Sequence, residues 1–150
     1  MSETFIVLIP DNINFIPSKE QILKIDQILQ IYFDFKVYYK FEINRNIEFY
    51  DPGMNFEEIL CPFCNTVIQL EWWQAQMGKY YIPNHGFQHL EIETPCCQKQ
   101  TTLNALKYNF KAGFSRFAII INDLVNLEQD IVNRISMELQ GPLKIIYRRI

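Results

Sequence analysis

The chain has 150 residues, of which 49% are hydrophobic, and its formal net charge is −3. This apolar content is enough to bury the core of one domain, and it excludes an intrinsically disordered chain. The mild acidity argues against a protein that holds nucleic acid mainly through phosphates, although a local basic patch is still compatible with it.

The amino-terminal sequence favours a cytoplasmic protein. An acid, Glu3, stands where a secretory signal has Lys or Arg, and the apolar run that follows covers only residues 5–9. No apolar stretch approaches the roughly 20 residues that cross a bilayer. We therefore expect a soluble protein with no membrane partner, in a reducing compartment where cysteines bind metal or do redox chemistry more often than they form disulfides.

The first part of the chain predicts a strand followed by a helix. Residues 5–9 are continuously apolar and end at Pro10, which is typical of a strand buried on both faces. Ser18 is a predicted N-cap with Gln21 as its capping-box partner. Apolar residues then recur at helical spacing to about Phe33.

Two further strands follow from their periodicity. Apolar and polar residues alternate over 37–49, which predicts a half-solvated strand, and so long a strand leads us to expect a turn or bulge near 44–46. Residues 117–121 form a second continuously apolar strand.

The carboxy-terminal part predicts a helix and a last strand. Asn126 is the predicted N-cap, with Gln129 in the capping-box position. Gly141 and the proline after it are expected to end this helix, and residues 143–147 form the last strand.

This order of elements predicts an α+β fold with a ferredoxin-like split βαβ core. The core comprises residues 1–50 and 114–150 of a single domain, and residues 51–113 form a zinc-ribbon-like insertion. The first and third strands are central in that arrangement, and these are the two apolar ones. Because such strands need cover on both faces, we expect the insertion, or a partner chain, to cover the face opposite the helices.

Within the insertion we expect three short elements. Residues 71–79 should form a helix, 89–93 a strand, and 102–108 a second short helix begun by a threonine cap.

All four cysteines lie in the insertion, as Cys61, Cys64, Cys96 and Cys97. A Cys-x-x-Cys turn answered by a second cysteine cluster can close four thiolates around one structural zinc ion. Asn65 follows the first pair, where such turns favour positive φ, and asparagine tolerates that conformation better than other non-glycine residues.

The fourth ligand is open on sequence grounds. Side chains of the adjacent Cys96 and Cys97 point apart in an extended chain, so both bind one ion only if the backbone kinks. His85 or His89 could replace Cys96.

Two other functions compete with a structural metal. The Cys-Pro-Phe-Cys sequence is similar to a glutaredoxin active site, which requires Cys61 at a helix N-terminus. A nucleic-acid-binding zinc ribbon would use basic side chains around the insertion, and these are Lys99, Lys107, Lys111 and Arg116.

Five short motifs together resemble a known family. They are Cys61-Pro-Phe-Cys, Glu71-Trp-Trp, Thr94-Pro-Cys-Cys, the Thr102–Tyr108 segment and Ala112-Gly-Phe-Ser-Arg-Phe. This succession resembles a widespread family of uncharacterised bacterial zinc-ribbon-like proteins, some of which carry a transporter-ATPase label. The resemblance implies zinc on the cysteines. The ATPase label does not carry over, because the chain has no Walker-type loop.

These observations favour a non-catalytic, zinc-containing module that binds another protein. A bacterial immunity or adaptor role would suit the small size, mild acidity and lack of marked catalytic groups. Aromatic residues should pack around the cysteines, and the candidates are Trp72, Trp73, Tyr108 and Phe114.

Overall fold

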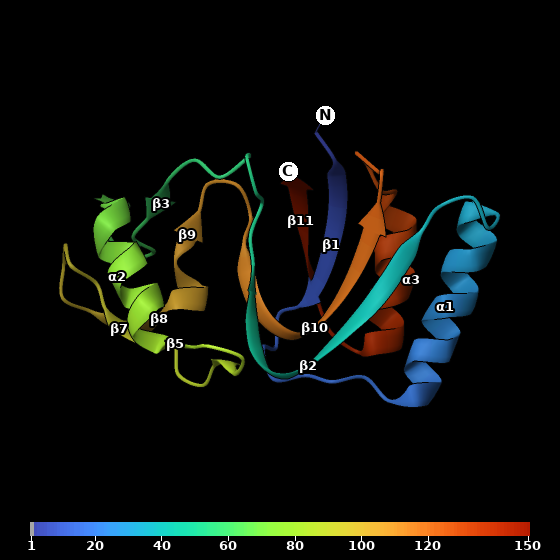
Figure 1. Ribbon diagram of the computed structural model, residues 1–150, viewed down its shortest axis with the longest axis horizontal. Coiled ribbons are helices and arrows are strands. Elements are labelled where there is room, and N and C mark those ends of the chain that lie inside the picture. Colours follow the sequence, from blue (N-terminus) through green and yellow to red (C-terminus); the bar gives the residue numbers. More distant parts are fainter. Residues whose placement is uncertain (1) are drawn as a thin grey trace.

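The computed structural model describes residues 2–150 and has an α+β fold with antiparallel sheets (Figure 1). Its helices are α1 (Lys19–Phe33), α2 (Leu70–Tyr80) and α3 (Gln129–Leu139), with one 3-10 turn at Leu103–Ala105. The longer strands are β1 (Thr4–Pro10), β2 (Tyr39–Tyr50), β10 (Gly113–Asn122) and β11 (Leu143–Arg149). Among residues 2–150, no helix combines the length and apolarity that crossing a bilayer requires.

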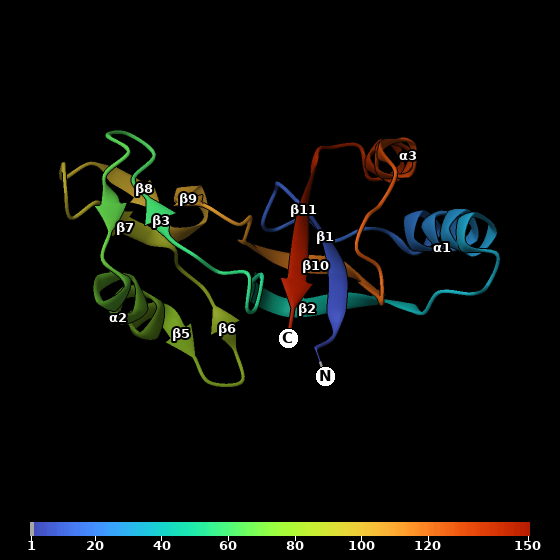
Figure 2. The ribbon, with the colours of Figure 1, turned by 90° about the horizontal axis from the view of Figure 1, so that it is seen from above.

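The main sheet has six strands in the order β11-β1-β10-β2-β6-β5. The two continuously apolar strands, β1 and β10, are neighbours inside it, as their sequence predicts. The last two strands are short, β5 (Tyr81–Ile82) and β6 (Gly86–Phe87), and both come from the cysteine-bearing part of the chain. Helices α1 and α3 lie together beside the sheet (Figure 2).

The amino-terminal cap of α1 is the one that the sequence predicts. Ser18 Oγ accepts a hydrogen bond from Gln21 N at 3.1 Å, and Gln21 Oε1 accepts one from Ser18 N at 2.8 Å. This reciprocal pair satisfies two amides at the start of the helix. The buried stripe of α1 comprises Ile25, Leu29 and Phe33, the residue at which the helix ends.

Both ends of α3 differ from the sequence prediction. The N-cap is Glu128 rather than Asn126, with no side-chain cap. Leu127 lies just before the N-cap, Val132 lies in the first turn of the helix, and both belong to one buried cluster. An apolar contact of the hydrophobic-staple type therefore fixes the start of the helix, in place of the predicted capping box. At the other end the left-handed residue is Gln140, with φ of 59°, one position before the predicted glycine.

The expected irregularity in β2 is a large bulge. Ser115 of β10 pairs with Glu48 of β2, and Phe117 pairs with Ile43, so β2 has three more residues than β10 between these pairs. The strand is continuous, but its pairing with β10 is interrupted at residues 44–47. Both strands bend at this point (Figure 1), which divides the sheet into an arm that carries the helices and an arm that carries the cysteines.

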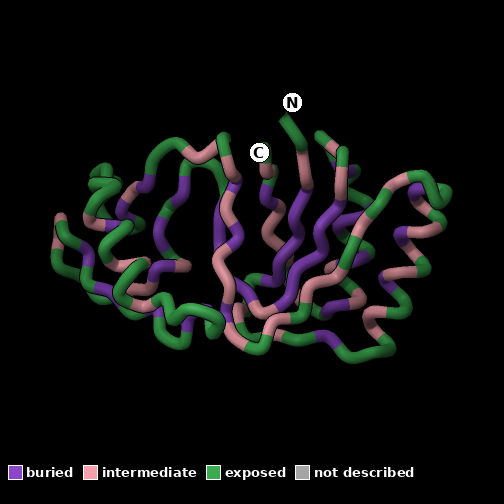
Figure 3. Tube along the Cα trace, in the orientation of Figure 1, coloured by how far each residue is buried: buried purple, intermediate pink, exposed green. Residues whose placement is uncertain are grey.

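Each arm has its own core. Under α1 and α3 the cluster includes Phe117, and on the other arm it includes Phe114. Figure 3 shows buried backbone along β1 and β10 and in the cysteine-bearing part, with exposed loops at the rim of both. We call residues 51–112 the cysteine lobe.

The cysteine lobe does not cover the face opposite the helices, contrary to the expectation from sequence. The buried cluster on that face takes none of its members from residues 51–112; they are Val7, Ile9, Tyr50, Ala118, Ile120 and Ile146. Tyr50, just beyond the bulge, covers part of this face instead, and its hydroxyl donates to Glu42 at 2.8 Å. The buried residues on this face therefore all come from the strands β1, β2, β10 and β11.

Two of the three elements expected in the cysteine lobe form as predicted. Helix α2 matches the expected 71–79, and β7 (Glu91–Glu93) lies within the expected 89–93. The helix expected over 102–108 is wrong: only a 3-10 turn forms there, followed by β9 (Lys107–Tyr108). Thr102 does cap this turn, since its Oγ1 accepts from Ala105 N at 3.2 Å, but pairing of β9 with β3 (Ile59–Leu60) ends it.

Candidate metal centre

The first cysteine pair lies in a tight turn between β3 and β4 (Val67–Ile68). Cys61 N donates to Thr66 O at 2.9 Å and Asn65 N donates to Cys61 O at 3.0 Å, which closes the turn. Phe63 N also points at the site, 3.4 Å from Cys61 Sγ. Asn65 adopts the predicted left-handed conformation, with φ of 59°.

The second cysteine cluster lies in a turn of the same construction, between β7 and β8 (Gln100–Thr102). Thr94 N donates to Lys99 O at 2.9 Å and Gln98 N donates to Thr94 O at 3.0 Å. Gln98 has φ of 55°, like the asparagine of the first turn. The backbone bonds of residues 94–99 therefore repeat those of residues 61–66.

This equivalence explains how two adjacent cysteines reach one site. Cys97 takes the place that Cys64 has in the first turn, and Thr94 takes the place of Cys61. Cys96 corresponds to Phe63 and supplies the remaining sulfur from inside the turn. The backbone kink that this pair requires is the turn itself.

The four sulfur atoms have the spacing of a tetrahedral metal site. All lie within 4.8 Å of one another, with 3.7 Å between the sulfurs of Cys61 and Cys97 and 3.4 Å between those of Cys64 and Cys96. A tetrahedron of thiolates about 2.3 Å from zinc has sulfur atoms about 3.8 Å apart. All four cysteines are free rather than paired in disulfides. The residues present thus fit a four-sulfur metal site.

The thiols influence one another's protonation. The Thr66 hydroxyl and backbone amide lower the pKa of Cys64 to about 6. Burial and, after it, the neighbouring sulfurs raise the pKa of Cys96 to about 12. Burial also raises the pKa of Cys61, but backbone amides outweigh that effect and lower it overall. Four thiolates cannot gather here without a cation, because each added negative charge opposes the next.

The histidine alternatives lie outside the sulfur cluster. His85 and His89 are both exposed, and the group of residues 2–150 that could hold a metal consists of the four cysteines. His89 Nδ1 instead lies 3.9 Å from Glu91 Oε2. Cys96 therefore occupies the position for which a histidine was considered.

The aromatic residues expected around the cysteines differ in how far they are buried. Trp73, Tyr108 and Phe114 are buried in the same apolar cluster as Cys61, whereas Trp72 packs at its margin. These rings belong to α2, β9 and β10, so the cluster links the first turn to the end of the main sheet. The arrangement makes the cysteine site part of the core of its lobe.

The glutaredoxin-like and nucleic-acid-binding alternatives require features that the structure provides only in part. Cys61 lies in a turn between two strands, and not at the helix N-terminus that a glutaredoxin-like thiol requires. Of the four basic residues, Lys99 lies over the Phe63 ring and Lys107 donates to Asn65, both beside the first turn. Arg116 instead donates to Asn44 O at the bulge.

Thr94 has a role at the site that was not predicted from the sequence. Its side chain is 1% exposed, its Oγ1 accepts from Lys99 N at 3.0 Å, and the same atom lies 3.3 Å from Cys97 Sγ. The repeated pattern of a residue, proline, another residue and cysteine at 61–64 and 94–97 is visible in the sequence. That repeat aligns Thr94 with Cys61.

Comparisons with known proteins identify no relative of this chain. No family model, no curated protein and no solved structure matches the chain. The resemblance to the bacterial zinc-ribbon-like family therefore stays a prediction, and the candidate metal centre rests on its geometry.

Proposed function

We propose that Cys61, Cys64, Cys96 and Cys97 bind one structural zinc ion, and that this ion holds the two turns of a zinc-ribbon-like lobe together. The observation that carries the proposal is the convergence of four free thiols, at tetrahedral spacing, from two turns with the same backbone hydrogen bonds. Four cysteine sulfurs in a closed tetrahedral site are one of the usual ligand sets of structural zinc.

The remaining part of the chain serves as the scaffold. We infer a ferredoxin-like core, which is supported by the antiparallel order β11-β1-β10-β2 and by helices that follow β1 and β10 in the chain. In this proposal the lobe is an insertion between β2 and β10.

The biological role that fits best is a non-catalytic module of the cytoplasm that binds another protein, as an immunity or adaptor protein does. Apolar side chains flank the first turn and support this role: Phe63 is 47% exposed, Val67 49% and Leu70 43%. Lys99 and Lys107 lie beside them. An apolar patch with a basic rim suits a partner with an apolar contact surface and acidic residues around it.

Metal content tests the first proposal. Protein purified without added metal should contain one zinc per chain by elemental analysis, and Cys61→Ser should lose it. Hydrogen exchange should then show faster exchange in the lobe, at β3, β7 and β8, while β1 keeps its protection in the separate core under the helices. A Cys61→Ser protein with full metal content and an unchanged exchange pattern would contradict the proposal.

Partner binding is tested separately at the first turn. A photocrosslinking residue at position 63 should give a defined crosslinked protein in cells, and Val67→Ser should reduce its yield. Position 23 on α1 is the matched control, because Leu23 is also exposed, at 61%, but lies far from the cysteines in the chain. Equal crosslinking from both positions would remove the argument for this surface.

A further inference from the structure

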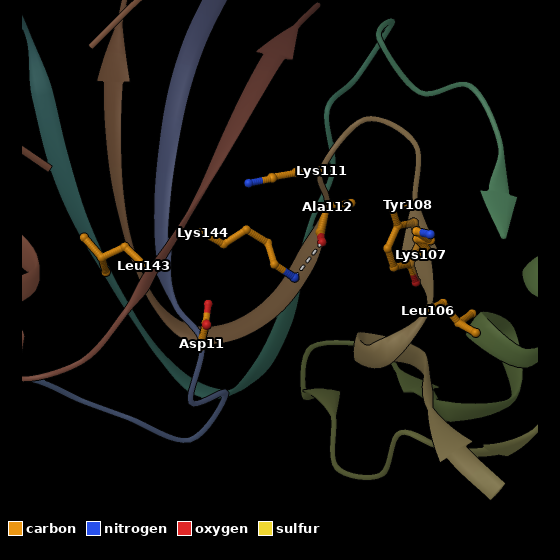
Figure 4. Close-up of a pocket in the computed structure, with 8 residues that line it drawn as sticks. All are labelled: Asp11, Leu106, Lys107, Tyr108, Lys111, Ala112, Leu143 and Lys144. Atoms are coloured by element: carbon orange, nitrogen blue, oxygen red, sulfur yellow. Dashed lines mark hydrogen bonds between the residues drawn. The ribbon is translucent and has the colours of Figure 1, made fainter. Parts of the chain in front are cut away.

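A cavity of about 330 Å³ lies between the cysteine lobe and the edge of the main sheet, and none of the cysteines lines it. Its charged lining comes from three parts of the chain: Asp11 after β1, Lys107 and Lys111 from the lobe, and Lys144 from β11. Figure 4 shows Lys111 and Lys144 extending into the space between β11 and residues 111–112, with Asp11 beside them.

The charge of this cavity is opposite to that of the whole protein. The Lys107 ammonium donates to Asn65 at the first cysteine turn, but Lys111 and Lys144 against Asp11 still leave an excess of positive charge, in a chain whose net charge is −3. The ion pairs among residues 2–150 lie elsewhere, at Lys36, Lys40 and His89. The lysines of the cavity are thus not neutralised by close carboxylates.

Lys144 is held in place by the surrounding backbone. Its ammonium donates to Ala112 O at 3.1 Å and so uses one of its three protons on an uncharged acceptor. A Cβ atom at residue 113 would lie 2.9 Å from Lys144 Nζ and 3.3 Å from Asn104 Oδ1, so Gly113 leaves the room that the ammonium occupies. Burial lowers the pKa of Lys144, and Lys111 lowers it further against the opposing effect of Asp11.

A second donor lies next to this ammonium. Asn104 Oδ1 accepts from Phe114 N at 2.9 Å, which leaves the amide NH₂ group free to donate. Asn104, Asp11 and Lys144 all line an adjoining hollow of about 290 Å³. The two hollows together offer ammonium and amide donors around one space, with a single carboxylate able to accept from a hydroxyl group.

We propose that this cavity binds the phosphate group of a small phosphorylated molecule, with Lys111 and Lys144 as the charged ligands. A phosphate monoester carries close to two negative charges at neutral pH, which the two lysine ammonium groups can pair. The volume lies at the small end of the range for ligand pockets, which favours a small metabolite over a macromolecule. The site uses none of the cysteines, so it does not depend on the identity of the metal.

The experiment is a titration of the zinc-replete protein at low salt with inorganic phosphate and with glycerol 3-phosphate, followed by NMR shifts of backbone amides. Both ligands should shift the amides of residues 111–113 at low-millimolar concentration, and glycerol should shift none of them. Lys111→Gln should weaken binding about tenfold, as expected for the loss of one charged hydrogen bond. Asp11→Asn should strengthen it, because it removes the one negative charge of the lining.

Lys24→Gln on α1 is the matched control, since it removes the same charge from an exposed position elsewhere. It should leave the affinity unchanged. No shift with either phosphate, or equal weakening by Lys24→Gln and Lys111→Gln, would overturn the proposal. Tighter binding of a single-stranded oligonucleotide at the same amides would overturn it in favour of nucleic acid. Lys111 is exposed, so its variant should fold even if Lys144→Gln does not.

Discussion

Trp73 Nε1 donates a hydrogen bond to Tyr108 Oη at 3.1 Å, and Tyr108 Oη donates to Leu103 O at 2.8 Å. This buried chain joins α2 to β9 and to the 3-10 turn before it, and the two rings meet edge to face at 74°. Tyr108 is buried, which raises the pKa of its hydroxyl and keeps it protonated as a donor. The cysteine lobe therefore has a polar link in its core as well as the proposed metal.

Replacing this hydroxyl should destabilise the lobe. Tyr108→Phe leaves the indole N–H and the Leu103 carbonyl without partners, and a buried unsatisfied group costs about 1–3 kcal/mol. We expect a loss of this size in the free energy of unfolding, measured with denaturant on the zinc-bound protein. Tyr38→Phe is the control, because Tyr38 is 69% exposed and should tolerate the change. Equal stability of the two variants would show that the link is unimportant.

The equivalence of the two turns predicts that the fourth sulfur can be moved. Cys96→Ser should lower the affinity for zinc by more than about a hundredfold, since loss of an outer-shell partner alone costs about 10–100-fold. Adding Thr94→Cys to that variant should restore much of the affinity, because Thr94 has the backbone position of Cys61. Competition with a chromophoric chelator measures both affinities.

The mirrored exchange in the first turn is the control for this prediction. Phe63→Cys combined with Cys61→Ser places the sulfur where Cys96 has it in the second turn. It should bind zinc better than Cys61→Ser alone. If neither double variant improves on its single variant, the turns are not interchangeable.

Two glycines should respond to alanine in opposite directions. Gly53 has φ of 62°, and a Cβ there would clash with the Arg149 carbonyl that also accepts from Met54 N at 2.6 Å. Gly53→Ala should cost more than about 1 kcal/mol in unfolding free energy. Gly78 lies in α2 with no atom near the added Cβ, so Gly78→Ala should stabilise by about 0.5–1 kcal/mol. Thermal melting compares the pair, and a change of the same sign in both would contradict the backbone argument.

Ser115 lies at the bulge, and we expect its replacement to destabilise the protein. Ser115 is fully buried; its Oγ donates to Phe117 O at 2.7 Å and accepts from Phe117 N at 3.1 Å. Ser115→Ala removes both bonds and should cost about 1–3 kcal/mol. Denaturant unfolding measures the loss, with Ser2→Ala as an exposed control. An unchanged midpoint would mean that water or a shift of the strand replaces the serine.

Local patterns in the sequence determined much of the scaffold. The period of the apolar residues gave the α+β class, the helix at 19–33 and the two apolar strands, because one buried face repeats at fixed spacing along each element. The capping box at Ser18 and the positive φ at Asn65 follow from the chemistry of single side chains. The cysteine spacing likewise indicated a four-sulfur cluster.

Contacts between residues that are distant in the chain decided the remaining features of the fold and its cavity. The start of α3 depends on Leu127 entering a core that other elements build, and local capping residues cannot predict this. The buried cluster on the face opposite the helices includes Tyr50 from beyond the bulge, since a bulge changes which residues meet across two strands. The cavity at Lys144 gathers residues from three separate parts of the chain. Periodicity reports the faces of one element, whereas only folding determines which faces meet.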